Sequence, residues 1–256
     1  MIRTVSATRY VAPLREGGSL PGLVEADDLG IYVCKFRGAG QGVKVLVAEV
    51  LVGELARRLG IRTPDLVAVE LDPVIGTYEA DEEVQDLLTA SIGLNLGVDF
   101  LPGSFGYDAA YEPDPDAAAS ILWLDALTAN VDRSWRNPNL LVWHHRLWAI
   151  DHGACLYFHH AWPGGLGSRE RFARQPYDAS DHVLAGYRSG LPAADARLAP
   201  LVTRDLLEEV AAEVPDPWLQ PVPGAETPAD LRHAYVDFLA ARVAGDRAWL
   251  PVAGAA

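Results

Sequence analysis

The sequence of 256 residues contains only two cysteines and no long apolar run. Cys34 and Cys155 are too few for a disulfide framework, and because each lies in an apolar stretch we expect two small core side chains. The longest apolar stretch, residues 45–52, contains Glu49 and falls far short of the roughly 18 residues that span a membrane. The first residues also lack the apolar segment of a signal peptide. These absences predict a cytoplasmic protein with no membrane partner.

Positive charge is scarce as well. The chain carries 21 Lys and Arg against 35 Asp and Glu, a formal net charge of −14. Such a surface repels nucleic acid and anionic membranes, so we expect no nucleic-acid partner, and any phosphate site must be built locally. Half of the residues are hydrophobic and 22% are charged, which is typical of a folded protein long enough to form two lobes.

Only two of the basic residues are lysines, Lys35 and Lys44. Lys35 lies in an apolar segment, residues 31–36, that is predicted to be a strand, and alternation places it on the same face as Ile31 and Val33. A lysine on an apolar face needs an anionic partner, either a phosphate or a carboxylate. The alternative is an edge strand on which Lys35 points to water.

A helix is predicted for residues 44–59, with Gly60 at its end. Glu49 borders the apolar face of this helix and is therefore the candidate partner of Lys35. Glu54 falls on the opposite side, where we expect a solvated surface acid that pairs with neighbouring arginines.

The order of the predicted elements indicates an α+β fold with two lobes. Strands are expected at residues 4–11, 23–26, 31–36 and 66–71. Beyond residue 95 helices dominate, and they are expected at residues 115–129, 178–187, 203–213 and 228–244. We therefore expect a β-rich N-terminal lobe over residues 1–94, a connection over residues 95–103, and a helical C-terminal lobe over residues 104–256.

The stretch from residue 130 to 153 contains the pattern that indicates chemistry. Asp132 is followed five residues later by Asn137, then by a predicted hairpin, and then by Asp151-His152-Gly153. Kinases use one Asp to orient the acceptor hydroxyl, and an Asn and a second Asp before Gly to bind magnesium. The spacing and the hairpin therefore favour phosphoryl transfer. The alternative is a helix end capped by Asp and Asn, followed by an unrelated hairpin.

Two glycine-rich turns are candidates for covering the phosphates. Residues 17–22 include Gly18 and Ser19, whose backbone amides could contact a phosphate, although the kinase pattern G-x-G-x-x-G is absent and a plain hairpin turn is an equal alternative. Residues 37–42 precede the start of the predicted helix and form a rival loop, which Lys44 could assist.

Together these segments resemble the HipA-like kinases, especially the compact bacterial branch. The matching pieces are YVCKF, VLVAEVLVGELARRLG, LNLGVDFLPG, TANVDRSWRNPNLL and IDHGACLYFHH. The resemblance implies a two-lobed protein-kinase-like fold with ATP in the cleft and with Lys35 on the phosphates. It implies Asp132 as the catalytic Asp, and Asn137 and Asp151 as magnesium ligands. Its hinge would touch adenine through the backbone near Asn95, Asp99 and Leu101.

The resemblance implies ATP- and magnesium-dependent transfer of the γ-phosphate to a hydroxyl, preferably of a protein serine or threonine. The acceptor cannot be read from the residues, because a protein, a peptide and a small molecule all fit. The chain departs from the family where no His-Arg precedes Asp132 and where Arg133-Ser134 replaces Arg-His.

Two other functions remain as alternatives. One is a pseudokinase, which binds nucleotide or a partner without turnover. The other is a metal-dependent hydrolase centred on Asp151 and the nearby histidines, which are His144, His145, His152, His159 and His160.

Overall fold

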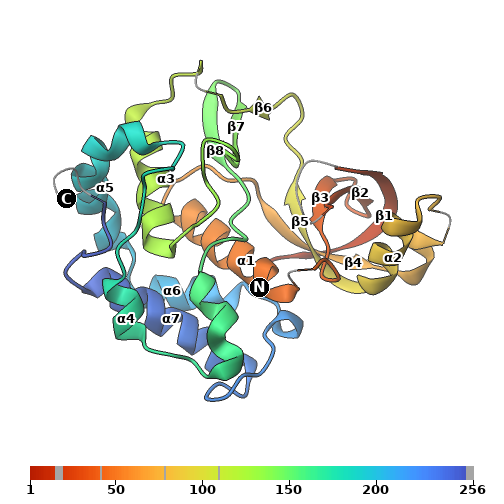
Figure 1. Cartoon of the computed structure of the whole chain (residues 1–256). Coiled ribbons are helices and arrows are strands. Elements are labelled where there is room, and N and C mark those ends of the chain that lie inside the picture. The colour runs from red at the N-terminus through yellow and green to blue at the C-terminus, as the bar shows by residue number, and fades with distance from the viewer. Residues whose placement is uncertain (15–19, 41, 78, 109, 252–256) are drawn as a thin grey trace.

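The computed structural model describes residues 1–14, 20–40, 42–77, 79–108 and 110–251. A small closed sheet lies on one side, a larger and mainly helical part lies on the other, and one helix runs between them (Figure 1). The expected α+β fold with two parts is confirmed. Within the described residues, no helix is both long enough and apolar enough to cross a membrane.

The closed sheet has the strand order β1-β2-β3-β5-β4. Its strands are β1 (Thr4–Pro13), β2 (Gly22–Ala26), β3 (Ile31–Lys35), β4 (Leu66–Leu71) and β5 (Gly93–Asp99). All pairs are antiparallel except β1 with β4. The interior is filled by small and branched side chains, including Val24, Cys34 and Val69, and by Val84 and Leu88 from helix α2 (Glu82–Ala90).

Strand β5 occupies much of the segment that the sequence assigned to a hinge. It pairs with β3 on one side and with β4 on the other, and Lys35 lies opposite Leu96. Gly97 is required for this tight packing, because a Cβ atom there would lie 2.7 Å from methyl groups of Val67 and Val69. Part of the segment expected as a connection is therefore a strand, in which glycine allows close packing.

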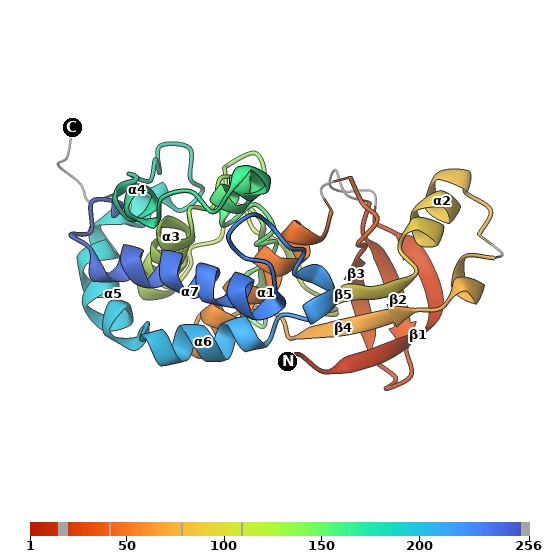
Figure 2. The same cartoon turned by 90° about the horizontal axis from the view of Figure 1, so that it is seen from below.

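Helix α1 (Val43–Arg58) connects the two parts, and Figure 2 shows it between the sheet and helices α6 and α7. Every residue from 46 to 56 is buried, and the apolar side chains of α1 share one core cluster with the helical part. The expectation of a solvated Glu54 is wrong, because its side chain is 1% exposed and pairs with Arg57. The helix is covered on more than one side, so its surface has no fully polar face.

The helical part contains a small hairpin beside its helices. The helices are α3 (Pro115–Thr128), α4 (Arg169–Arg174), α5 (Leu191–Leu198), α6 (Arg204–Ala212) and α7 (Pro228–Ala244). The three-stranded sheet is formed by β6 (Phe105–Gly106), β7 (Leu140–Trp143) and β8 (Arg146–Ala149). The core contains four buried tryptophans, Trp123, Trp162, Trp218 and Trp249.

Short 3-10 turns complete the fold. They are η1 (Pro73–Gly76), η2 (Tyr157–Gly164), η3 (Ala185–Gly190), η4 (Ala199–Leu201) and η5 (Asp216–Trp218). The helix expected at residues 178–187 is not formed. Instead, His182 pairs as an isolated bridge with Ser134, and η3 follows. This extended segment borders the loop that contains Asp132.

The buried pair of Glu54 and Arg57 gives an asymmetric prediction for stability. Arg57→Ala leaves a buried carboxylate without its partner, and we expect it to lower the free energy of unfolding by on the order of 2–3 kcal/mol. Glu54→Ala should cost less, because the Arg57 side chain is 48% exposed and can turn to water. Urea unfolding of both variants measures the difference.

The control is Arg58→Ala, which removes an exposed pair with Glu209 and should change stability little. A smaller loss for Arg57→Ala than for Glu54→Ala would show that the buried carboxylate does not depend on this arginine.

Candidate active site

Lys35 lies at the end of β3 and contacts two carboxylates. Its ammonium group donates to Oε1 of Glu49, and it donates to Oδ1 of Asp151 at 2.8 Å. The lysine side chain is 13% exposed, and its expected anionic partner is present as a pair of carboxylates. Its face of β3 is not the buried face that was expected, because Ile31 is 41% exposed and the interior of the sheet is lined by Tyr32 and Cys34. Residues that are far apart in the sequence are thus joined at one cation.

Glu49 also holds the Asp151-His152-Gly153 segment. Its second oxygen, Oε2, accepts a hydrogen bond from the backbone N–H of His152 at 3.0 Å. Gly153 makes this approach possible, because a Cβ atom there would lie 2.5 Å from Val45 and 3.1 Å from Glu49. Gly153 is therefore required at this position, because it packs directly against α1.

The charges of these three groups depend on one another. Burial raises the pKa of Glu49 to about 7, Lys35 opposes that rise, and Asp151 adds to it. Burial alone would lower the pKa of Lys35, but the two carboxylates raise it above its usual value. Burial acts to raise the pKa of Asp151, yet Lys35 keeps it below its ordinary range. Lys35 is therefore a cation and Asp151 an anion, and the Asp151 side chain, 46% exposed, is open to a ligand.

Asp132 and its loop form a second group of polar side chains. The amide of Asn137 donates to Oδ2 of Asp132 at 3.0 Å. The amide of Asn139 donates to the backbone carbonyl of Asp132 at 2.6 Å and lies 3.5 Å from Oδ2. The Asp132 side chain is exposed, and two asparagines fix its orientation. Sequence reasoning missed Asn139, although the repeated asparagine in Asn137-Pro138-Asn139 was a visible signal.

Arg133 is buried directly after Asp132 and connects three segments. Its Nε donates to Oδ2 of Asp125 on α3 at 2.6 Å. One terminal nitrogen donates to the carbonyls of Asn139 and Ile150, the latter at 3.0 Å, and the other lies 3.3 Å from Nδ1 of His152. One guanidinium therefore binds α3, the Asp132 loop and the segment around Asp151.

Asp125 is the counter-ion of this arrangement and is fully buried. Besides Arg133, it accepts hydrogen bonds from the amide of Asn130 at 2.8 Å and from the ring of His182 at 3.0 Å. Burial would raise the pKa of Asp125, but Arg133 and His182 lower it below the ordinary range. Burial and Arg133 lower the pKa of His152 to about 3, so this histidine is neutral. No local pattern indicated Asp125, which lies inside an apolar helix.

The residues predicted for adenine contact have different environments. Asn95 is buried, and its side chain accepts from the backbone of Arg37 at 2.9 Å and donates to the carbonyls of Ser91 and Gly93 at 2.8 Å each. Its side chain therefore holds a turn, and its backbone lies within β5, opposite Val69 of β4. The expected backbone contact with adenine stays a prediction. Asp99 ends β5, and Leu101, 4% exposed, follows it.

The two glycine-rich turns differ in what the structure describes. Gly18 and Ser19 lie outside the described residues, and their predicted contacts with phosphate stay predictions. In the rival loop, the backbone N–H groups of Arg37, Gly38 and Ala39 donate to Asn95, Ser91 and Phe36, respectively. These amides are used inside the protein, so the loop over residues 37–42 does not present them to a phosphate.

The histidines do not form the site that a hydrolase would need. Among the described residues, the metal-capable group of histidine, cysteine and acidic side chains is Asp125, His152 and Cys155, which are all buried, and it excludes Asp151. Arg133 already contacts two of its members. A guanidinium therefore occupies the position where a cation would bind.

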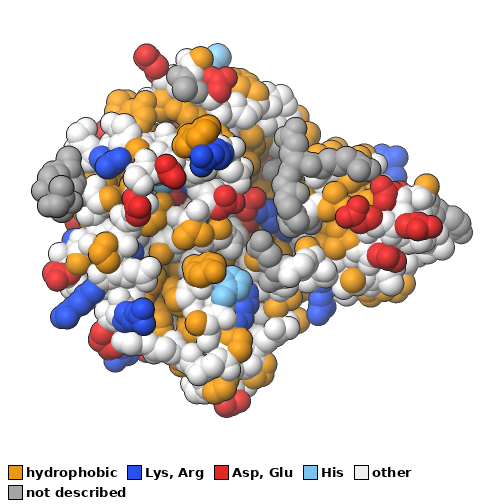
Figure 3. Space-filling model, in the orientation of Figure 1, with side chains coloured by type: hydrophobic (Ala, Val, Ile, Leu, Met, Phe, Trp, Pro, Cys, Tyr) orange, Lys and Arg blue, Asp and Glu red, His pale blue; other side chains and the backbone are white. Residues whose placement is uncertain are grey.

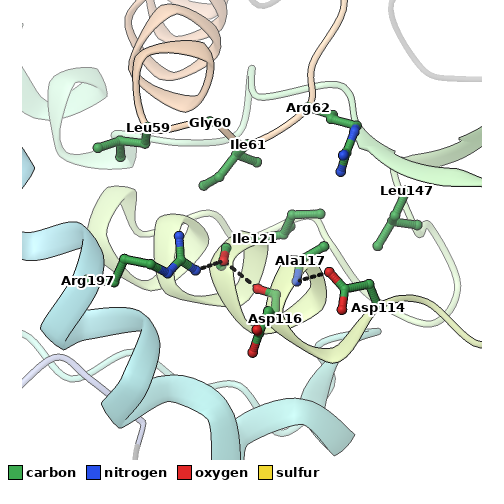
Figure 4. A pocket seen from close by; sticks show the side chains of 11 residues that line it. Leu59, Gly60, Ile61, Arg62, Asp114, Asp116, Ala117, Ile121, Leu147 and Arg197 are labelled. Carbon is green, nitrogen blue, oxygen red and sulfur yellow. Dashed lines mark hydrogen bonds between the residues drawn. The ribbon is translucent and has the colours of Figure 1, made fainter.

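A pocket lies away from these residues. It has a volume of about 170 Å³ and is enclosed by the end of α1, the start of α3, Leu147 of β8, and α5 (Figure 4). Arg62 and Arg197 stand on either side of Asp114 and Asp116, and none of the residues named above for the site lines it. Figure 3 shows a different part of the surface. At its centre, where the sheet meets the helical part, acidic side chains lie next to a basic side chain.

The comparisons with known proteins agree with this geometry. The model of the family described as HipA-like kinase matches residues 8–162. A solved structure of the Helicobacter pylori proinflammatory kinase CtkA has a TM-score of 0.55 at 11% identity and covers 90% of this chain and 89% of that one. The Golgi casein kinase has a TM-score of 0.42 at 12% identity, with 95% and 73% covered. No curated protein matches.

The similarity to CtkA shows the fold, since the sequences share so few residues, and it confirms the two-lobed, kinase-like arrangement. The family match extends over more than half of the sequence. It includes β3 with Lys35, helix α1 with Glu49, the Asp132 loop and Asp151. The chain therefore belongs to the HipA-like kinase family.

Proposed function

We propose that the protein transfers the γ-phosphate of ATP to a hydroxyl, preferably that of a protein serine or threonine, with the help of magnesium. The observation that supports this most strongly is the position of Lys35, whose ammonium group lies between Glu49 and Asp151. Kinase chemistry requires such a lysine near the phosphates and an acidic side chain near the metal.

The residues around Lys35 divide the task of holding ATP and magnesium. Lys35 would bind the phosphates, and Glu49 would keep it in place through their buried ion pair. Asp151 and Asn137 offer oxygen ligands, which magnesium prefers, and the exposed part of Asp151 fits that role. Magnesium would neutralise negative charge on the phosphates, and the protein would supply position and electrostatic stabilisation.

Asp132 would orient the acceptor hydroxyl and accept its proton. Its carboxylate is exposed, as contact with a second substrate demands, and Asn137 and Asn139 hold it in one orientation. We propose that the adenine contacts the backbone after β5, near Asp99 and Leu101. We also propose that residues 1–94 and 104–256 form the two lobes, and that the protein acts in the cytoplasm.

The pseudokinase alternative requires that at least one of these steps fails. Lys35, Glu49, Asp132, Asn137 and Asp151 are all present, and the structure joins them in two hydrogen-bonded groups. This arrangement favours turnover, which the following variants test.

Asp132 and Asp151 should fail in different ways. Asp151→Asn removes a charged magnesium ligand, so the magnesium-dependent affinity for ATP should fall at least about tenfold. Asp132→Asn should leave this affinity nearly intact and lower turnover by roughly 10²–10⁴-fold, because proton transfer matters only after binding. Calorimetry with ATP, with and without magnesium, and a turnover assay measure both effects.

Asp205→Asn provides the matched control, since this aspartate is exposed on α6 and should change neither quantity. Equal losses of ATP affinity in Asp132→Asn and Asp151→Asn would contradict the two roles.

Lys35 and Glu49 should behave as one unit. Lys35→Ala leaves the buried Glu49 without its partner and should lower the free energy of unfolding by on the order of 3–5 kcal/mol. The same change should also lower the affinity for ATP, because it removes the proposed contact with the phosphates. Lys35→Arg should also lose turnover, because a planar guanidinium cannot replace a compact ammonium between two anions. Glu49→Ala should reduce turnover, since Lys35 would then bind Asp151 alone and compete with the metal.

Melting temperatures and ATP turnover separate these effects. Glu25→Ala, which breaks an exposed pair with Arg9, serves as the control and should leave both unchanged. Normal turnover in Glu49→Ala would disprove the proposed dependence of Lys35 on this carboxylate.

A further inference from the structure

The loop between Asp132 and Asn137 exposes side chains that none of the roles above explains. Trp135 is 62% exposed, and Val131, next to Asp132, is 67% exposed. The guanidinium of Arg136 lies over the Trp135 ring, 4.3 Å from its centroid, and is exposed as well. Trp135 and Arg136 therefore form one exposed surface, and Val131 lies four residues before Trp135 in the chain. Large exposed apolar side chains typically mark a binding surface, and tryptophan and arginine are common at its centre.

This part of the loop is held in place by the rest of the fold. The Ser134 hydroxyl accepts hydrogen bonds from the backbone N–H groups of Arg136 and Asn137, each at 3.3 Å. The backbone N–H of Trp135 donates to the carbonyl of Asp181 at 3.3 Å. Trp135 is therefore kept in solvent by a fixed turn, and a partner that covers it loses little entropy in ordering this loop.

The same turn lies directly beside the carboxylate proposed to orient the acceptor. Asn137 follows Arg136 in the chain, and its amide binds the carboxylate of Asp132 at 3.0 Å. A molecule that covers Trp135 and Arg136 would therefore extend from the acceptor hydroxyl at Asp132.

The charge of Arg136 identifies the partner further. The other arginine of this loop, Arg133, is buried on Asp125, whereas Arg136 forms no ion pair with the described residues. An exposed guanidinium without a counter-ion attracts a carboxylate from a partner. The net charge of −14 opposes a nucleic-acid partner.

We propose that Val131, Trp135 and Arg136 form a docking surface for a protein or peptide acceptor. The acceptor carries an Asp or Glu close to the phosphorylated hydroxyl, which binds Arg136, and an apolar residue that packs on Trp135. This inference rests on the proposed kinase function and names the class of its acceptor.

The test uses the full chain with ATP, magnesium and a dephosphorylated peptide library prepared from a whole proteome. Mass spectrometry identifies the new phosphorylation sites, and we expect Asp and Glu to be enriched beside them. Arg136→Glu should remove that enrichment. We also expect the ratio of the rate on an acidic peptide to the rate on a neutral peptide to fall at least about tenfold, which corresponds to a change of 1.4 kcal/mol. Trp135→Ala should raise KM for peptides. Neither variant should change ATP affinity measured by calorimetry.

Arg171→Glu on α4 is the matched control, since it introduces the same charge at another exposed position and should keep the wild-type preference. Sites without acidic neighbours, or the same preference in Arg136→Glu as in the wild type, would overturn the inference. So would ATP turnover that never labels a peptide, which would indicate a small-molecule acceptor. A wild-type chain without any ATP turnover would instead contradict the proposed function, and the inference with it.

Discussion

The buried ion pair between Arg133 and Asp125 holds the parts of the site in one arrangement. A charge in the interior is tolerated only when its hydrogen-bonding groups are satisfied. Arg133 meets this condition by donating to Asp125, to the carbonyls of Asn139 and Ile150, and toward the ring of His152. Since these groups come from α3, from the loop after Asp132 and from the segment around Asp151, the contacts of one guanidinium hold the Asp132 loop and the Asp151 segment in place relative to each other.

A second interaction joins this centre to the closed sheet. Helix α1 packs with the helical part, yet its Glu49 binds both Lys35 at the end of β3 and the backbone of His152 in the helical part. The pKa of Glu49 is raised to about 7 by burial, so its charge depends on the neighbouring Lys35. The position of the lysine is therefore linked to the packing of α1 between the two parts.

The sequence predicted these contacts where local patterns carry the information. The apolar segment around Lys35 and the helical period of α1 brought Lys35 and Glu49 together correctly, and the hairpin over residues 140–149 followed from its apolar pairs. Glu54 was placed wrongly, because helical periodicity does not show that a second layer covers the other face of a helix. Asp125 was not predicted, because its partners Asn130 and Arg133 follow the end of α3 in an irregular loop, and its third partner, His182, is brought to it only by the tertiary fold.

The proposed transfer of phosphate by these residues can be measured in a single experiment. The full chain is incubated with magnesium and ATP labelled at the γ-phosphate, and both ADP formation and the label on protein serine or threonine are followed by mass spectrometry, in the chain itself and in a cell lysate. The account predicts ADP formation together with label on a hydroxyl side chain, and neither without magnesium. Tight binding of ATP with no ADP and no labelled protein would contradict it and would identify the chain as a pseudokinase.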